Sequence, residues 1–374
     1  MGWNRVIGQP RVKELLRRAL QNKQIAHAYL FYGGEGVGKD AVAIEFARAL
    51  NCEKQSDEAC DMCASCKKFD GMKHSNIHFI HALPVGKNEV KGDNPVGVLT
   101  ESQVEELQEQ LQRKAENPYH RISMPKATFI KINSIREIKR QSSLTMFESG
   151  KKVFIISRAD DMNAEASNSL LKTLEEPSSN TVLLLTTSQR DTLLPTIISR
   201  CQMVQFDPID ESEIRDHLIA REGVEREQAG LIAILSEGSY ARAVELLSVE
   251  IKDEREGAVQ FMRAALSARP SLLFPEIEKL SAGSDRTAVE RALRMLQAWL
   301  REALVVRERG GSQNGEVYED VRRFIERFPN ANLAVALESV ETSIALVGKN
   351  VYLPLILTNL AFDLKKCSAA QEAH

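Results

Sequence analysis

The sequence contains no apolar run that approaches the roughly 18 residues of a membrane-spanning helix. Its first stretch, MGWNRVIGQPRVKELL, also lacks the apolar core of a signal peptide. Both absences argue against insertion in a membrane and against secretion. We therefore expect a cytoplasmic protein with no membrane partner.

Strong net charge is missing as well. The 49 Lys and Arg residues nearly balance the 52 Asp and Glu residues, which leaves a formal net charge of -3. A chain this close to neutrality has no bulk electrostatic attraction to nucleic acid. Any contact with DNA must therefore be local or shared with partner proteins.

Cysteine is scarce and unevenly placed, which argues against a disulfide scaffold. Four of the six cysteines fall between residues 52 and 66 with the spacing C-x7-C-x2-C-x2-C. Four thiolates at such intervals can close tetrahedrally on Zn²⁺ and leave no open position, so the metal would be structural rather than catalytic. The predicted zinc ligands are Cys52, Cys60, Cys63 and Cys66. We interpret His74, His78 and His81 as ordinary loop or strand residues, because a fifth ligand is unnecessary.

The 374 residues exceed the roughly 250 to 300 at which a single core stops growing, so two or three domains are expected. Short apolar segments rich in β-branched and aromatic residues predict strands at 28–33, 76–83, 152–159 and 181–188. Helical periodicity is found at 10–23, 40–51 and 164–176. This alternation predicts a mostly parallel sheet covered by helices on both faces.

After Phe206 the strand patterns stop and helical patterns continue to the end of the chain. Helices are expected within 211–223, 226–238 and 239–250, and again from about 251 onward, with a polar loop at 309–316. We place boundaries near Asp207 and Ile251. The predicted domains are 1–206, 207–250 and 251–374.

A polar insertion at about 84–125 interrupts the alternating pattern. Thr100 and Gln103 have the spacing of a capping box, and Val104, Leu107 and Leu111 form a narrow apolar stripe. The insertion therefore contains a surface helix. A solvated decoration is the favoured interpretation over a partner-binding role.

The segment GGEGVGKD, residues 33–40, lies between a predicted strand and a predicted helix. Glycines let the backbone wrap around phosphates, and a lysine here reaches the β and γ oxygens. The predicted phosphate-loop residues are Gly33, Gly34, Gly36, Gly38, Lys39 and Asp40. The motif ordinarily ends on a Ser or Thr hydroxyl that holds Mg²⁺. A carboxylate at position 40 is able to ligate the metal but also repels phosphate, so this residue alone leaves activity open.

The second half of a hydrolytic site should be a strand that ends in acidic residues. Here the strand KVFII runs into Ser157 and Arg158. Asp160 and Asp161 follow three to four residues later, and we interpret them as caps of the next helix. Because two metal-holding positions are altered together, we do not expect a working Mg-ATP hydrolysis site.

Arg200 stands in the segment TIISRCQ at the edge of the predicted sheet domain. An exposed arginine is usually only solvated charge. At a subunit edge, however, an arginine can reach the γ-phosphate of a neighbour's nucleotide and stabilise the transition state in trans.

These motifs in this order resemble the clamp-loader branch of the AAA+ proteins, specifically the bacterial DNA polymerase III gamma/tau and delta-prime subunits. The resemblance rests on VIGQ (6–9), AHAYLFYGGEGVGK (26–39), the four-cysteine module, NSLLKTLEEP (168–177) and LPTIISRC (194–201). It implies an α/β P-loop NTPase domain with a parallel sheet and a zinc module. A small helical lid domain and an all-α collar domain would follow.

Within this family, gamma/tau subunits hydrolyse ATP, whereas delta-prime commonly lacks a working site and donates the arginine of its Ser-Arg-Cys motif. Asp40 at the P-loop hydroxyl, with Ser157 and Arg158 at the Asp-Glu positions, favours the delta-prime branch. The resemblance implies that Arg200 is an arginine finger in trans. It also implies a heteropentamer with gamma/tau and delta subunits that loads the sliding clamp onto primed DNA.

Three alternatives stay open at this point. One is an active gamma-type ATPase in which Asp40 ligates Mg²⁺. A second is an initiator or helicase-loader type of AAA+ protein, against which the Ser-Arg-Cys and cysteine modules argue. A third is a zinc-containing DNA-binding module, although only Lys67, Lys68 and Lys73 lie beside the cysteines.

Overall fold

The computed structural model divides into two compact units, Met1–Gly223 with Ser236–Val244 and Val224–Leu235 with Glu245–His374. The structure describes residues 2–69, 72, 74–86, 89–144, 150–178, 180–247, 251–267, 269–282, 285–309, 319–349 and 351–369. Most of the predicted polar loop at 309–316 lies outside these residues.

The first unit is built on a sheet of five parallel strands in the order β2-β3-β4-β1-β5. The strands are β1 (Ala28–Tyr32), β2 (Ile77–Ile80), β3 (Lys152–Ile156), β4 (Thr181–Thr187) and β5 (Gln202–Gln205). The central strands β3 and β4 are buried along their whole length, which explains their continuous apolar sequences. The four strands predicted from the sequence are confirmed, and β5 was not predicted.

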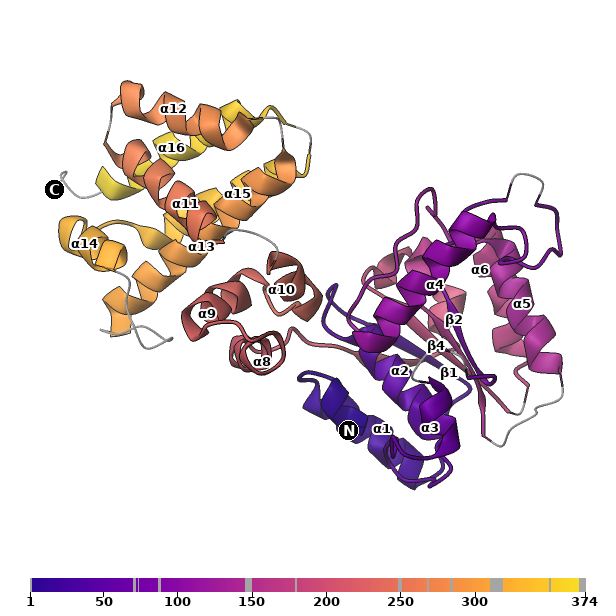
Figure 1. Ribbon diagram of the computed structural model, residues 1–374. Helices are drawn as coiled ribbons and strands as arrows, with labels where there is room; N and C mark the ends of the chain where they lie inside the picture. Colours follow the sequence, from indigo (N-terminus) through magenta and orange to yellow (C-terminus); the bar gives the residue numbers. More distant parts are fainter. Residues whose placement is uncertain are drawn as a thin grey trace. The chain divides into compact units, whose positions relative to one another are not determined.

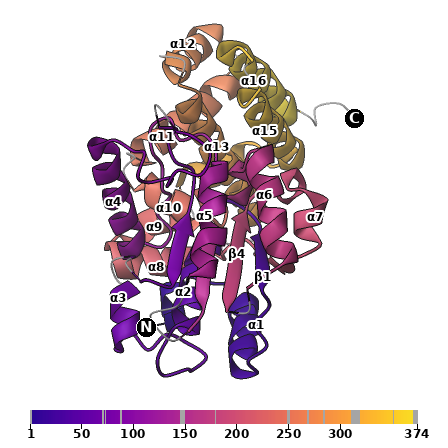
Figure 2. The ribbon, with the colours of Figure 1, turned by 90° about the vertical axis from the view of Figure 1, so that its right-hand side faces the viewer.

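Helices cover both faces of this sheet. The unit contains α1 (Pro10–Gln21), α2 (Lys39–Leu50), α3 (Ala64–Phe69), α4 (Glu101–Glu116), α5 (Ile132–Ser143), α6 (Ala164–Glu175), α7 (Pro195–Ile198) and α8 (Glu211–His217). Figure 1 shows α1 and α2 on one side of the strands and α5 and α6 on the other, and Figure 2 shows α5 in front of the sheet. The predicted parallel α/β fold is therefore confirmed.

Different side chains of β1 face the two helical layers, as the alternation of a strand requires. Leu30 joins the core formed with α5, α6 and α7, which includes Ile135 and Leu170. Tyr29 points to the other face and contacts the ring of Phe46 in α2 edge-on, with the two ring centroids 5.4 Å apart. Because all five strands are parallel, their carboxyl ends meet at one edge of the sheet, and α2 begins there after β1.

The second unit is helical throughout its described residues. It contains α9 (Arg226–Leu235), α11 (Ile251–Leu266), α12 (Pro270–Ser281), α13 (Arg286–Arg309), α14 (Glu319–Arg327), α15 (Leu333–Val347) and α16 (Leu353–Ala369). The apolar stripe of α13, with Val289, Leu293 and Leu300, packs into one core with Val340 of α15 and Leu357 of α16. The helix α10 (Tyr240–Leu246) begins in the first unit.

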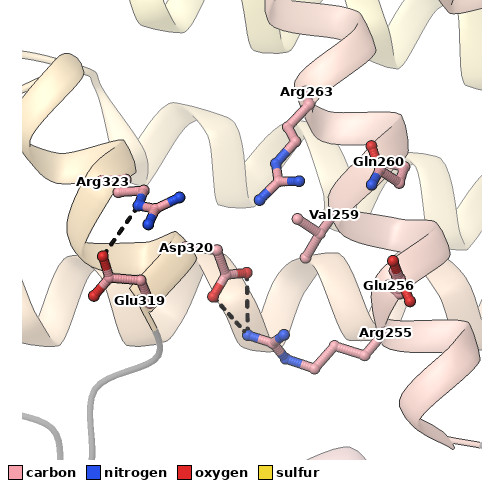
Figure 3. Close-up of a pocket in the computed structure, with 8 residues that line it drawn as sticks. All are labelled: Arg255, Glu256, Val259, Gln260, Arg263, Glu319, Asp320 and Arg323. Carbon is pink, nitrogen blue, oxygen red and sulfur yellow. Dashed lines mark hydrogen bonds and ion pairs between the residues drawn. The ribbon is translucent and has the colours of Figure 1, made fainter.

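A polar cavity lies between α11 and α14 in this second unit (Figure 3). One of the acidic residues that line it is Asp320, which accepts hydrogen bonds from Arg255 at 3.0 Å and from Trp299 Nε1 at 2.9 Å. Arg323 pairs with Glu319 at 3.0 Å on the same wall. The two bonds to Asp320 attach α14 to α11 and α13, whereas the Arg323–Glu319 pair lies within α14. None of the described helices is both long and apolar enough to cross a membrane.

Candidate functional site

The loop at 33–38 joins β1 to α2 and is packed against the rest of its own unit. Gly36 and Gly38 have φ values of +72° and +98°, a region that favours glycine. A Cβ at Gly38 would lie 3.0 Å from the Tyr119 hydroxyl, and a Cβ at Gly36 would overlap Ser239 Oγ. The glycines are therefore required by backbone conformation and by the close approach of other segments.

Hydrogen bonds fix the carbonyl groups of this loop. Tyr240 N donates to Gly36 O at 3.1 Å, and Gln9 Nε2 donates to Val37 O at 3.2 Å. Lys39 Nζ folds back onto the loop, where it donates to Gly33 O at 2.9 Å and also to Gly34 O. Burial lowers the pKa of Lys39, and the nearby Asp40 carboxylate opposes that shift.

Asp40 lies in the first turn of α2 and is the centre of a polar cluster. Its Oδ2 accepts from Lys114 Nζ at 2.9 Å and from Ser157 Oγ at 2.8 Å, and its Oδ1 accepts from Thr186 Oγ1 at 2.8 Å. Burial alone would raise the pKa of Asp40, but the ammonium and the two hydroxyl groups outweigh it and lower that pKa. Asp40 is therefore held as a carboxylate.

This cluster does not fit a Mg²⁺ ion. Mg²⁺ requires oxygen ligands at about 2.0 to 2.1 Å in octahedral geometry. The Lys114 ammonium lies 2.9 Å from the carboxylate oxygen that would have to ligate the ion. Ser157, which follows β3 directly, brings a hydroxyl where a second carboxylate would be needed, and that hydroxyl is already bonded to Asp40.

The next residues correct one prediction. Asp160 and Asp161 do not cap α6; they lie in a separate short 3-10 helix, Ala159–Asp161. The cap is Asn163, whose side chain accepts from Ala166 N at 2.8 Å. The carboxylate of Asp161 instead forms an ion pair with Arg158 Nε at 2.8 Å.

The insertion contains the predicted helix, with both hydrogen bonds of the Thr100 and Gln103 capping box present. Leu107 of its apolar stripe is buried in a small cluster with Leu83 and Met124. The interpretation as a solvated decoration is wrong, because Lys114 near the end of α4 is only 2% exposed and reaches Asp40.

Two further residues of the same segment reach the phosphate loop. The Tyr119 ring covers Gly38, and its hydroxyl accepts from Ile7 N at 2.7 Å. Arg121 pairs with Glu35 at 2.9 Å. Sequence reasoning missed Lys114, Tyr119 and Arg121. A signal existed for Lys114, since it continues the spacing of Val104, Leu107 and Leu111 and thus occupies a stripe position.

The four predicted zinc ligands converge. The Sγ atoms of Cys52, Cys60, Cys63 and Cys66 all lie within 4.8 Å of one another. Cys63 N and Cys66 N donate to the Sγ atoms of Cys60 and Cys63, each at 3.4 Å. Backbone N–H groups lower the pKa of Cys60 to about 6, whereas burial raises the pKa of Cys52 and Cys66. A set of four close thiols suits a tetrahedral metal ion.

His74 and His78, two of the three nearby histidines, have other partners. His74 is buried, with Nε2 2.9 Å from Ser65 Oγ and Nδ1 accepting from Asn76 N at 3.1 Å. The ring of His78 stacks on Phe154 at 4.8 Å. Their interpretation as ordinary loop and strand residues agrees with these contacts.

Arg200 lies between α7 and β5 at the edge strand of the sheet. Its guanidinium donates to Thr196 O at 3.0 Å and to Glu175 Oε1 at 2.8 Å, and its side chain remains 34% exposed. The neighbouring Cys201 is different, since burial raises the pKa of its thiol to about 12. Arg200 therefore offers a partly exposed cation held by a single acidic residue.

Comparison with known proteins places this architecture in a family. The model of the family described as "DNA polymerase III, delta subunit" matches residues 8–210. DNA polymerase III subunit delta' of Bacillus subtilis is 30% identical over 338 residues, covering 90% of this chain and 86% of the relative.

Two other relatives match shorter parts. Subunit delta' of Pseudomonas aeruginosa is 30% identical over 66% of this chain and 65% of its own length. Subunit tau of Bacillus subtilis is 29% identical over 66% of this chain and 37% of its own length. A solved DNA polymerase III gamma subunit-related protein from Thermotoga maritima covers 95% of this chain and 99% of its own, at 16% identity and a TM-score of 0.40. The chain belongs to the delta-prime family of bacterial DNA polymerase III clamp-loader subunits, which is related to gamma/tau.

Proposed function

We propose that this chain is a non-hydrolysing clamp-loader subunit that completes the ATP site of a neighbouring gamma/tau subunit. The observation that carries the first half is the Asp40 cluster. Both oxygens of the carboxylate at the metal-binding position accept bonds from Lys114, Ser157 and Thr186. A subunit without a metal site contributes to ATP hydrolysis only through what it offers to another subunit.

Arg200 is the group proposed for that contribution, as an arginine finger in trans. Its partly exposed guanidinium is tied to Glu175, whose own side chain is 49% exposed. An exposed ion pair of this kind is worth at most about 1 kcal/mol, so a phosphate group can compete for the arginine. The bond to Glu175 keeps the side chain oriented until a neighbour's nucleotide replaces the carboxylate.

The four cysteines are proposed to hold one structural Zn²⁺. The partners proposed for the chain are the gamma/tau and delta subunits in a heteropentamer, the sliding clamp, and primed DNA bound through the assembly. A cytoplasmic location and the division into a lid from about Asp207 and a collar from about Ile251 belong to the same proposal.

The decisive experiment reconstitutes the loader with gamma and delta subunits and compares wild type with Arg200→Ala and Arg200→Lys. ATP turnover at the neighbouring site should fall by about 10³-fold or more in both variants, because lysine lacks the planar fork of the guanidinium. Arg140→Ala is the matched control, since Arg140 is also an exposed arginine paired with a glutamate of its own chain.

Assembly of each complex is checked by size-exclusion chromatography, so that a lost finger is distinguished from a lost subunit. Clamp- and DNA-stimulated ATPase activity that stays at the wild-type level in the Arg200→Ala complex would show that the finger assignment is wrong. An equal loss with Arg140→Ala would show that the effect is not specific to Arg200.

A further inference from the structure

The insertion delivers a buried cation to the phosphate loop from a distant part of the chain. Lys114 is 74 residues away from Asp40 in the sequence, and its side chain is 3% exposed. Besides Asp40, its ammonium donates to His120 O at 2.7 Å and lies 5.6 Å from the centre of the Phe79 ring. A carboxylate, a carbonyl and an aromatic face thus surround the three donors of the ammonium.

The surroundings of Asp40 correspond to those of a metal ligand. Ser157 and Thr186 stand at the carboxyl ends of β3 and β4, and both turn their hydroxyl groups to the same carboxylate. Three oxygen-bearing side chains therefore meet at one point beside the phosphate loop, where P-loop proteins hold a cation. The cation found there belongs to the chain.

We propose that Lys114 is a built-in cation that replaces a divalent metal ion beside Asp40 and thereby completes the phosphate loop without metal or nucleotide. This gives the insertion a function. The inference rests on the proposed absence of a working metal site and explains how the chain tolerates a carboxylate at that position. It also implies that removal of Lys114 creates a site for a divalent cation.

The test measures urea unfolding of the full-length chain as wild type, Lys114→Met, Asp40→Asn and the double variant. Removing one partner of a buried ion pair raises the unfolding equilibrium constant by about 100- to 5,000-fold. Each single variant should show such a loss. The double variant should be more stable than either single variant, because no charge is left unpaired.

Mn²⁺ is then added to the zinc-loaded proteins. At a concentration about ten times its Kd, Mn²⁺ should lower the unfolding equilibrium constant of Lys114→Met about elevenfold. Wild type and the double variant should not respond, since one keeps the ammonium and the other lacks the carboxylate. Binding is read independently from the loss of the free Mn²⁺ signal in electron paramagnetic resonance.

Additive losses in the double variant, or equal stabilisation of wild type by Mn²⁺, would overturn the inference. If Lys114→Met does not fold, the inference is tested by comparing Asp40→Asn with the double variant. The inference requires the double variant to be the more stable of the two. The isolated chain has no neighbour for Arg200 to act on. A negative result in the urea and Mn²⁺ experiments therefore does not count against the arginine-finger proposal. The urea and Mn²⁺ results can likewise be interpreted if the arginine-finger proposal proves wrong.

Discussion

At the scale of single residues, His81 shows what burial beside the Asp40 cluster does to a titratable group. Its side chain is 8% exposed, and its Nδ1 lies 2.8 Å from Ala82 O. Burial lowers its pKa to about 4, with the Lys114 ammonium acting in the same direction and the Asp40 carboxylate against it. The folded protein therefore holds His81 neutral at physiological pH.

This shift predicts a stability that depends on pH. In the unfolded chain His81 titrates near its ordinary pKa of about 6.5, so the folded state binds fewer protons between that pH and about 4. Its contribution is complete above pH ~6.5 and is lost as the pH falls toward 4, to a total of about 3 kcal/mol. Urea unfolding of wild type and of His81→Phe at a series of pH values isolates the contribution of His81 to the free energy of unfolding.

The phenylalanine variant keeps an aromatic ring but cannot titrate. The difference in the free energy of unfolding between wild type and His81→Phe should change with pH in this window. A difference that stays constant from pH 7 to 4.5 would contradict the assignment. Other histidines contribute equally to both proteins and cancel.

At the scale of elements, the cysteine module and the N-terminus support each other. Trp3 is 2% exposed and donates its Nε1 hydrogen to Asp57 O at 2.8 Å, and Gly2 N donates to Asp61 Oδ2 at 3.0 Å. Arg48 of α2 pairs with the same Asp61. A metal ion that fixes the module should therefore also fix the N-terminal segment.

Metal removal provides the test of this coupling. We expect about one zinc per chain under reducing conditions, unchanged in Cys201→Ser and largely lost in Cys63→Ser. In a Trp299→Phe background only Trp3 reports, and a chelator should shift its fluorescence emission to longer wavelength. Zinc content well below one per chain in wild type, or emission that does not respond to the chelator, would contradict the prediction.

The sequence predicted those elements whose pattern is local. The strands at β1 to β4 and the capping box of α4 were found because burial and capping leave a short, regular signature. Strand β5 was missed because it is an edge strand with only Val204 buried. Asp160 and Asp161 were misread as caps, since Asp and Asn are equally good caps and only geometry selects Asn163.

Only part of the candidate site could be predicted from the sequence, again because only local patterns are visible there. The phosphate loop, Asp40 and the four cysteines are motifs with fixed spacing. The partner of Asp40 could not be predicted in this way, because Lys114 is one of several charged residues in a polar helix, and no local pattern states which distant carboxylate it meets. Only the packing of α4, through Leu107, brings the two together.

At the scale of the whole molecule, the groups that form the Asp40 cluster come from distant parts of the chain. They involve α2 with Asp40, α4 with Lys114, the end of β3 with Ser157, and β4 with Thr186. Lys114, Ser157 and Thr186 are each bonded to Asp40, so the four residues form one cluster. A change at any single position leaves the other three residues in place.

We therefore predict that the isolated chain does not turn over Mg-ATP and that Lys39→Ala leaves phosphate release at background. Asp40→Thr, which restores the ordinary motif, should not produce turnover, because Lys114 then remains as a buried ammonium and Ser157 still supplies no carboxylate. Phosphate release by the purified chain measures both. Turnover that Lys39→Ala abolishes would instead establish a gamma-type ATPase, in which the Lys114 ammonium leaves Asp40 when nucleotide binds.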